Sequence, residues 1–360
     1  MSSESTEKTI AYWLIIVIGF GWLGYIGAGV IMPITFAVIF AIFLYPLDKW
    51  IYQKIKVRWL SIPLSFTAVI VPLMTIGFLF SLQLTSIVES LPAIGATLQS
   101  GVQKLVGLAN AYLPFLGLDS EKLISSLGSG LMEGPLTFVK QGVISSSSLV
   151  VSAAITSIYT FLILYYRRSL ANFIIYHFER TVRSEIRTTL TKIKKTVQAY
   201  IGGLGLVVIF LAVINSAGLY LIGVKYPLFW GTLAGLLAVI PYLGTALGGM
   251  LPFLYSLATS DYSWQPIAVL VFYGFVQFLE GNIITPKIVG DKVNVNPLVA
   301  IVALVFFGQY WGVGGVILAL PLTSILRIIF AQFEETESLA HLMSTDASTK
   351  PKLFQKLADD

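Results

Sequence analysis

The chain has 360 residues, of which 56% are hydrophobic and 11% are charged, with a formal net charge of +5 and a mean hydropathy of +0.84. Soluble globular proteins carry about 25% charged residues, so this composition argues against a water-soluble fold and predicts a polytopic membrane protein. The absence of cysteine excludes disulfides, thiolate metal sites and a cysteine nucleophile. We expect no cofactor, no bound metal and no nucleic-acid partner.

Residues 1–88 are predicted to form N-terminal membrane helices. No charged residue occurs from Ile10 to Leu47. As one helix this stretch would be about 57 Å long, too long for a single crossing of a hydrocarbon core of roughly 30 Å. Gly27-Ala28-Gly29 and Pro33 offer a break, so we expect two passes, over residues 10–27 and 30–47. A third pass is expected over residues 60–88.

The middle of the chain alternates between polar and apolar segments. Residues 89–148 have mixed polarity with apolar residues at helical spacing, which predicts an amphipathic segment outside the membrane. A membrane helix is expected over 149–166. Residues 167–199 then predict one amphipathic helix, whose basic face meets anionic lipid or, as the sharper alternative, another subunit.

Positive charge predicts the topology of these segments. Residues 167–195 carry eight Lys or Arg against two Glu, whereas 89–148 carry three Lys against four acids. Because cytoplasmic segments are the basic ones, 167–199 is expected inside and 89–148 outside. The N-terminus and the polar tail, residues 331–360, are then both cytoplasmic.

Residues 200–330 contain two apolar runs, 227–257 and 297–330, that are each too long for one straight pass. Each is interrupted near its middle. The predicted hairpin tips are Pro241, Tyr242, Gly244, Gly248 and Gly249 in the first run, and Gly308, Gly312, Gly314 and Gly315 in the second. If both runs are re-entrant hairpins, Lys287 falls on the cytoplasmic side, as the charge rule prefers.

The predicted fold is therefore an all-α polytopic membrane protein with about six full transmembrane passes and two Gly/Pro-broken re-entrant helical hairpins. The hairpins belong to an inverted repeat of residues 200–258 and 266–330, which together form the expected transport core. Broken helices in inverted repeats are how many secondary transporters build a site near the membrane midplane. The alternative is eight transmembrane helices.

A polar stretch, Glu280-Gly-Asn-Ile-Ile-Thr-Pro-Lys287, follows an apolar run in this core. Gly281 and Pro286 are expected to break the helix, which frees backbone carbonyls that need protein or water as partners. Glu280 is the leading candidate for a proton, cation or substrate site, because an ionisable group near lipid is costly unless it has a function or a partner. It can instead pair with Lys287 or cap a helix end. Other pathway candidates are Asn282, Thr285, Lys287, Gln277 and Asn215, although packing or an interhelical hydrogen bond is the commoner role for Gln277 and Asn215.

Two glycine motifs are predicted to serve close helix packing. Gly19-Phe-Gly-Trp-Leu-Gly24 matches a nucleotide-binding pattern, but no strand precedes it and it lies in a membrane run. Gly231-Thr-Leu-Ala-Gly235 also lies in an apolar run. Small residues let membrane helices approach closely, and we expect that role for both.

The stretches Pro241–Gly244, Glu280–Gly290, Asn296–Leu298 and Gly312–Pro321 resemble the signature of the autoinducer-2 exporter (AI-2E) family of bacterial transporters. The resemblance implies an oligomeric protein of the bacterial inner membrane with roughly eight hydrophobic segments. It further implies export of a small signalling molecule in some members and sodium(lithium)/proton antiport in others.

Three functions remain open from the sequence. The first is secondary transport of a small polar solute out of the cell by alternating access, and the second is sodium(lithium)/proton antiport. The third is a non-transporting membrane scaffold that uses residues 89–148 for contacts. No ATPase loop or catalytic motif occurs, so we expect no enzyme. The expected partners are a small polar solute or a monovalent cation and proton, membrane lipid, and further copies of the chain in a homo-oligomer.

Overall fold

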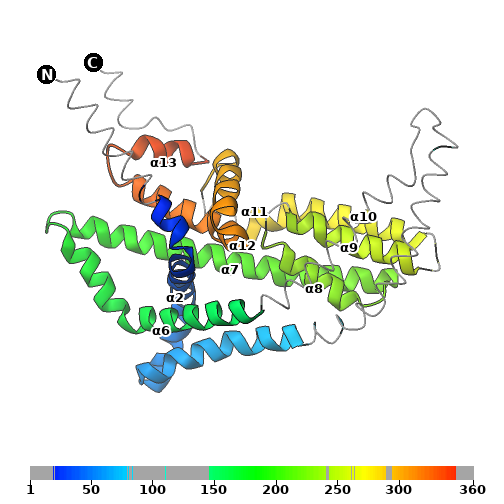
Figure 1. Ribbon diagram of the computed structural model, residues 1–360, viewed down its shortest axis with the longest axis horizontal. Coiled ribbons are helices and arrows are strands. Elements are labelled where there is room, and N and C mark those ends of the chain that lie inside the picture. The colour runs from blue at the N-terminus through cyan, green and yellow to red at the C-terminus, as the bar shows by residue number, and fades with distance from the viewer. Residues whose placement is uncertain are drawn as a thin grey trace, which may run out of the picture. The chain divides into compact units, whose positions relative to one another are not determined.

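The computed structural model describes residues 19, 21–78, 80, 83, 110, 146–240, 243–260, 262, 264–288 and 294–345 (Figure 1). Over these residues the chain forms helices joined by turns, without a strand. Six of the described helices are long and apolar enough to cross a membrane, and two shorter apolar helices accompany them. The chain is therefore an all-α polytopic membrane protein, as its composition predicts.

The helices are α2 (Ala28–Ile55), a helix over Arg58–Phe78, α6 (Ser146–His177), α7 (Arg183–Ile222), α8 (Pro227–Leu237), α9 (Leu243–Thr259), α10 (Trp264–Leu279), the π-helix η3 (Glu280–Ile284), α11 (Thr285–Ile288), α12 (Pro297–Phe330) and α13 (Glu337–Met343). Almost all of the predicted external segment, 89–148, lies outside the described residues.

The predicted N-terminal break lies at Gly27, a turn residue between helical residues 21–26 and α2. Pro33 lies inside α2 without ending it. Membrane helices tolerate proline where neighbouring groups satisfy the freed backbone carbonyl. α2 also continues past residue 47 to Ile55, because Asp48 is buried and paired, as described below, and does not mark the start of a water-exposed turn.

The sequence predicts one amphipathic helix over residues 167–199. In the structure this segment belongs to two helices. α6 ends at His177, residues 178–182 form a turn, and α7 begins at Arg183. The Nε of Arg183 donates to the backbone oxygen of Phe178 at 3.1 Å, which satisfies a carbonyl at the end of α6. The turn contains neither glycine nor proline, so local sequence gives no signal for it.

The chain divides into two compact units. The first comprises Met1–Phe66, Val151–Ile201 and Asp291–Asp360. In it α2 contacts α12, and α13 packs on α12 (Figure 1). Ile39 of α2, Val197 of α7 and Leu318 of α12 form one buried cluster, so three segments distant in sequence share this core.

The second unit comprises Thr67–Val150 and Gly202–Gly290. Its described helices include residues 67–78 of the helix over Arg58–Phe78 and the first residues of α6. The second half of α7 follows, then α8, α9 and α10, with η3 and α11 at the end (Figure 1). α9 packs against both α8 and α10. A buried apolar cluster joins α7, α8, α9 and α10. Its members are Leu219, Val224, Phe229, Trp230, Tyr255 and Val269.

Candidate functional site

Glu280 begins a π-helical turn that continues α10 without a gap. The turn spans Glu280–Ile284 and leads directly into α11. The break expected from Gly281 and Pro286 thus takes the form of a widened helical turn. Proline lacks the N–H that an α-helix would use at this position, and its ring crowds the carbonyl four residues earlier. A single π turn relieves this crowding, and such turns are frequent at functional sites.

Glu280 is half-buried next to a packed apolar cluster of the second unit. Val276 and Ile284, which precede and follow it in the helix, are 4% and 7% exposed. Both belong to a cluster with Val207 and Leu211 of α7 and with Ala238, the residue after α8. The turn that carries Glu280 is therefore flanked by residues packed in the second unit.

Glu280 does not pair with Lys287. Within the described residues, no ion pair or hydrogen bond joins either side chain to another side chain, and Lys287 is exposed. The two residues are seven positions apart, about 10 Å along a helix axis at 1.5 Å per residue. Side chains on a helix meet at a spacing of three or four residues, so this separation accounts for the missing pair.

Of the other polar candidates near Glu280, the structure describes the side chains of Gln277, Asn282 and Lys287. Gln277 and Asn282 are exposed, and the amide nitrogen of Asn282 donates to the backbone oxygen of Phe278 at 2.9 Å. That bond satisfies a carbonyl of the last turn of α10. The side chains of Thr285 and Pro286 lie outside the described residues.

Asn215 is buried in the middle of α7, at 3% exposure. Its Oδ1 has no hydrogen-bond partner among the described residues. The interhelical hydrogen bond that is commonest for such a residue is thus not made through this oxygen. A neighbouring close contact explains the burial: a Cβ at Gly231 of α8 would overlap the backbone nitrogen of Ser216. Gly231 therefore lets α8 lie directly against α7, as its glycine motif predicts.

The first apolar run forms a hairpin of two short helices. α8 has 11 residues and α9 has 17, about 17 and 26 Å in length at 1.5 Å per residue, so neither matches a core of roughly 30 Å. The two pack against each other. A Cβ at Gly244 would overlap the carbonyl oxygen of Leu237, which makes glycine necessary where the chain turns back. Pro241 and Tyr242 lie outside the described residues. A Cβ added at Gly248 would contact Ala234, and one added at Gly249 would contact the Tyr273 ring.

The second run, α12, bends sharply at Trp311 and Gly312. Gly312 has φ of 61° and ψ of −143°, a conformation that favours glycine. Beyond the bend, a Cβ at Gly315 would overlap the carbonyl oxygen of Phe307, and one at Gly308 would lie 3.1 Å from Val316 Cγ2. Residues eight apart in a straight helix are about 12 Å apart along its axis, so these contacts require the chain to fold back. Gly314 meets Met32 of α2.

The tip of this bend packs on the N-terminal glycine motif within the first unit. Tyr310 donates its hydroxyl to the carbonyl of Gly21, and Trp311 Nε1 donates to the carbonyl of Gly24 at 3.2 Å. A Cβ at Gly24 would overlap the Tyr310 hydroxyl. Gly24 thus serves close packing, as predicted, and the motif also supplies two carbonyl acceptors.

One charged site escaped the sequence analysis. Asp48 of α2 is fully buried, forms an ion pair with Arg167 of α6 and accepts a hydrogen bond from Ser61 Oγ at 2.6 Å. The guanidinium of Arg167 also lies 4.8 Å from the Tyr45 ring, and that of Arg58 donates to the carbonyl of Leu164 at 3.2 Å. The only sequence signal is an acid immediately after an apolar run.

Comparison with known proteins decides the family. The sequence profile of the AI-2E family transporters matches residues 10–335. The chain belongs to the AI-2E transporter family. It is 24% identical over 320 residues to YrrI of Bacillus subtilis (strain 168), covering 84% of this chain and 86% of that one. It is likewise 24% identical over 324 residues to YhhT of Escherichia coli (strain K12), covering 88% of both chains. With the AI-2 transport protein TqsA of the same strain it shares 32% identity over 121 residues, 34% of this chain and 35% of that one. As an AI-2E family transporter, the chain is a multi-pass membrane protein.

Proposed function

We propose that this AI-2E family transporter is a secondary transporter that moves a small polar solute out of the cell by alternating access. The observation that carries the proposal is Glu280: a half-buried carboxylate in a π turn, at the end of a helix long and apolar enough to cross a membrane. A charge in such a place is costly, so it is retained where it lines a pathway or takes up a proton. Broken helical hairpins of the kind formed by α8 and α9 are the elements that secondary transporters move around a site.

A second candidate function is sodium(lithium)/proton antiport. It is favoured by the lack of any side-chain partner for Glu280 among the described residues. An unpaired carboxylate can hold either a proton or a monovalent cation, which is the exchange that such an antiporter requires.

We further propose the bacterial inner membrane as the location, with both termini cytoplasmic, and a homo-oligomer as the assembly. The charge distribution supports the orientation. The family resemblance supports the location and the assembly.

The test is flux through purified protein in liposomes. Vesicles preloaded with autoinducer-2 or other small polar organics report export, and an internal pH dye reports proton movement when sodium, lithium or potassium is added. We expect Glu280→Gln to lower the active flux at least about tenfold, the effect of losing roughly 1.4 kcal/mol of a required interaction. Its yield and thermal unfolding should match wild type, because the amide has nearly the same size.

Glu334→Gln is the matched control, since Glu334 is an exposed acid after α12. Equal flux in wild type and Glu280→Gln would remove Glu280 from the mechanism. No flux of any solute or cation in wild type would favour the scaffold function.

A further inference from the structure

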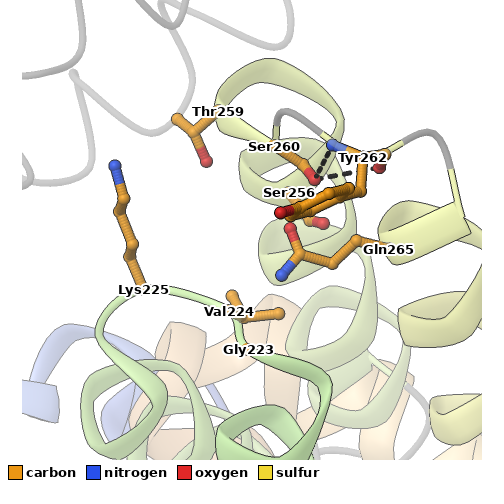
Figure 2. A pocket seen from close by; sticks show the side chains of 8 residues that line it. All are labelled: Gly223, Val224, Lys225, Ser256, Thr259, Ser260, Tyr262 and Gln265. Atoms are coloured by element: carbon orange, nitrogen blue, oxygen red, sulfur yellow. Dashed lines mark hydrogen bonds between the residues drawn. The ribbon is translucent and has the colours of Figure 1, made fainter.

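A small polar pocket lies in the second unit where α7 and α9 end and α10 begins (Figure 2). Its volume is about 100 Å³, which is room for several water molecules or one small solute. Its lining is mostly polar and comprises Gly223, Val224, Lys225, Ser256, Thr259, Ser260, Tyr262 and Gln265. The pocket admits only a small solute.

Ser256 presents this pocket with a hydroxyl that makes no hydrogen bond to a described residue. The residue is 1% exposed, and its Oγ has no hydrogen-bond partner among the described residues. Buried hydroxyls are normally bonded, and an exception calls for an explanation such as a ligand. Because Ser256 lines the pocket, a polar atom bound there can supply the missing partner.

The walls around Ser256 are held by bonds of their own. Thr259 Oγ1 donates to the carbonyl of Tyr255 at 2.8 Å. Gln265 Nε2 donates to the carbonyl of Ile222 at 3.1 Å, which leaves the amide oxygen to accept from a ligand. Figure 2 shows the Gln265 side chain reaching into the space between these segments. Gly223, at φ of +84°, leaves the space beside Gln265 free of a second side chain, since a Cβ there would lie 3.4 Å from Gln265 Nε2. The pocket is thus preformed.

Lys225 gives the pocket a positive charge. Its side chain is exposed and stands across the pocket from Ser256 and Gln265 (Figure 2). No described carboxylate pairs with it, and none of the described residues that line the pocket is an acid. A lysine ammonium and a serine hydroxyl are both donors to a carboxylate, whereas the Gln265 oxygen requires a donor.

We propose that this pocket binds a small hydroxy-carboxylate. Its carboxylate lies between Lys225 and Ser256, and its hydroxyl donates to the Gln265 oxygen. This site is distinct from Glu280: Gln265 and Glu280 lie 15 residues apart along α10 and η3, about 22 Å at the helical rise. The inference goes beyond the proposed function, since binding here requires neither transport nor Glu280.

The test is binding to the purified full-length chain in detergent, measured by calorimetry without any ion gradient. The probes are sodium lactate, a hydroxy-carboxylate of suitable size, and glycerol, a neutral molecule of similar size, with sodium chloride as the salt control. Lactate should bind saturably, and Lys225→Gln and Ser256→Ala should each weaken it about tenfold, as the loss of one charge-assisted hydrogen bond predicts. Lys192→Gln, at an exposed lysine of α7, should leave it unchanged.

Asp261 provides a second charge control, since it adjoins Ser260 in sequence but lies outside the described residues. Asp261→Asn removes a negative charge and should not weaken lactate binding. Weaker binding in Asp261→Asn, or equal affinity for glycerol and lactate, would overturn the carboxylate assignment. Absence of saturable lactate binding, or identical affinity in wild type, Lys225→Gln and Ser256→Ala, would overturn the site. Because no flux is measured, failure here is distinct from failure of the transport proposal.

Discussion

Glu280 and Asp48 are two carboxylates set in apolar helices, and their surroundings give them different roles. Asp48 is fully buried, and its oxygens are bonded by Ser61 and Arg167, so its charge is compensated within the fold. Glu280 is half-buried among apolar neighbours, and no described side chain pairs with it. A compensated buried charge contributes to structure, whereas an uncompensated one in a membrane helix indicates function.

This difference predicts that Arg167 matters for stability. Arg167→Met leaves Asp48 buried without its partner, which costs about 3–5 kcal/mol for a buried pair. We expect a lower unfolding temperature of the detergent-solubilised protein, followed by tryptophan fluorescence. The double variant Asp48→Leu/Arg167→Met should lose less than Arg167→Met alone, because no unpaired charge remains. Arg168→Met, at the exposed neighbouring residue, is the control; equal losses for Arg167→Met and Arg168→Met would contradict the role of the pair.

At the scale of elements, the two hairpins turn in different ways. In the first, Gly244 fits against the Leu237 carbonyl seven residues earlier. In the second, Gly312 supplies the positive φ and Gly315 makes the close approach to Phe307. In the sequence, Gly244 and Gly312 each stand two residues after a tyrosine. In the fold, the close contact of Gly244 instead has its counterpart at Gly315. Similar glycine patterns thus serve turns of different geometry.

We expect that neither turn can accommodate a side chain in place of its glycine. Gly244→Val would overlap backbone atoms, and Gly312→Val would force valine into a conformation that costs roughly 1–3 kcal/mol. We expect much lower yields of monodisperse protein for both, measured by size-exclusion chromatography. Gly274→Val in α10 is the control, since nothing lies within 4 Å of a Cβ there. Wild-type yields for Gly244→Val and Gly312→Val would show that both turns have room for a side chain.

Hydrogen bonds connect the end of α13 to the residues at the start of α12. Asn294 Oδ1 accepts from Thr345 Oγ1 at 2.6 Å, from the Thr345 backbone at 3.0 Å and from Ser344 Oγ at 3.2 Å. The backbone nitrogen of Asn296 donates to the carbonyl of Met343 at 2.9 Å, while its side chain caps α12 through Val299. These bonds connect α13 directly to the second hairpin.

Asn294→Ala should therefore release α13. It removes the acceptor of three hydrogen bonds, each worth about 1 kcal/mol net, and it places alanine at φ of 45°. We expect at least tenfold faster hydrogen exchange of backbone amides in residues 337–345 by mass spectrometry. Gln309→Ala, at an exposed position of α12, should leave that exchange unchanged. Unchanged exchange in Asn294→Ala would mean that packing alone holds the helix.

At the scale of the whole molecule, the open question is which segments cross the membrane. Re-entrant hairpins place Tyr262 outside and Lys287 inside, whereas eight straight passes reverse both positions. The cysteine-free chain permits a direct test, because each introduced cysteine is the only thiol.

We expect Tyr262→Cys to react with a membrane-impermeant maleimide on intact cells and Lys287→Cys to react only after permeabilisation. Both side chains are exposed in the structure, so access is not limited by burial. Glu334→Cys, in the tail segment before α13, controls for membrane integrity. Labelling of Lys287→Cys in intact cells would favour eight transmembrane helices.

The sequence alone predicts the membrane class, the family, the positions of most long helices and the glycines of the two hairpins. These features are local: a run of apolar residues predicts a membrane helix wherever it occurs, and glycine is needed wherever backbone must approach backbone. Glu280 was a candidate on the same basis, as an acid within an apolar run.

The roles of these parts depend on contacts that form only in the folded chain. The ion pair of Asp48 with Arg167 joins residues 119 positions apart, and the Ser256 pocket is assembled from the ends of three helices. The break between α6 and α7 carries no local signal, and the apolar cluster on either side of Glu280 joins Val276 and Ile284 to residues of α7. Charge pairing and burial depend on which residues become neighbours in space, and sequence periodicity specifies a face of a helix but not the partner that covers it.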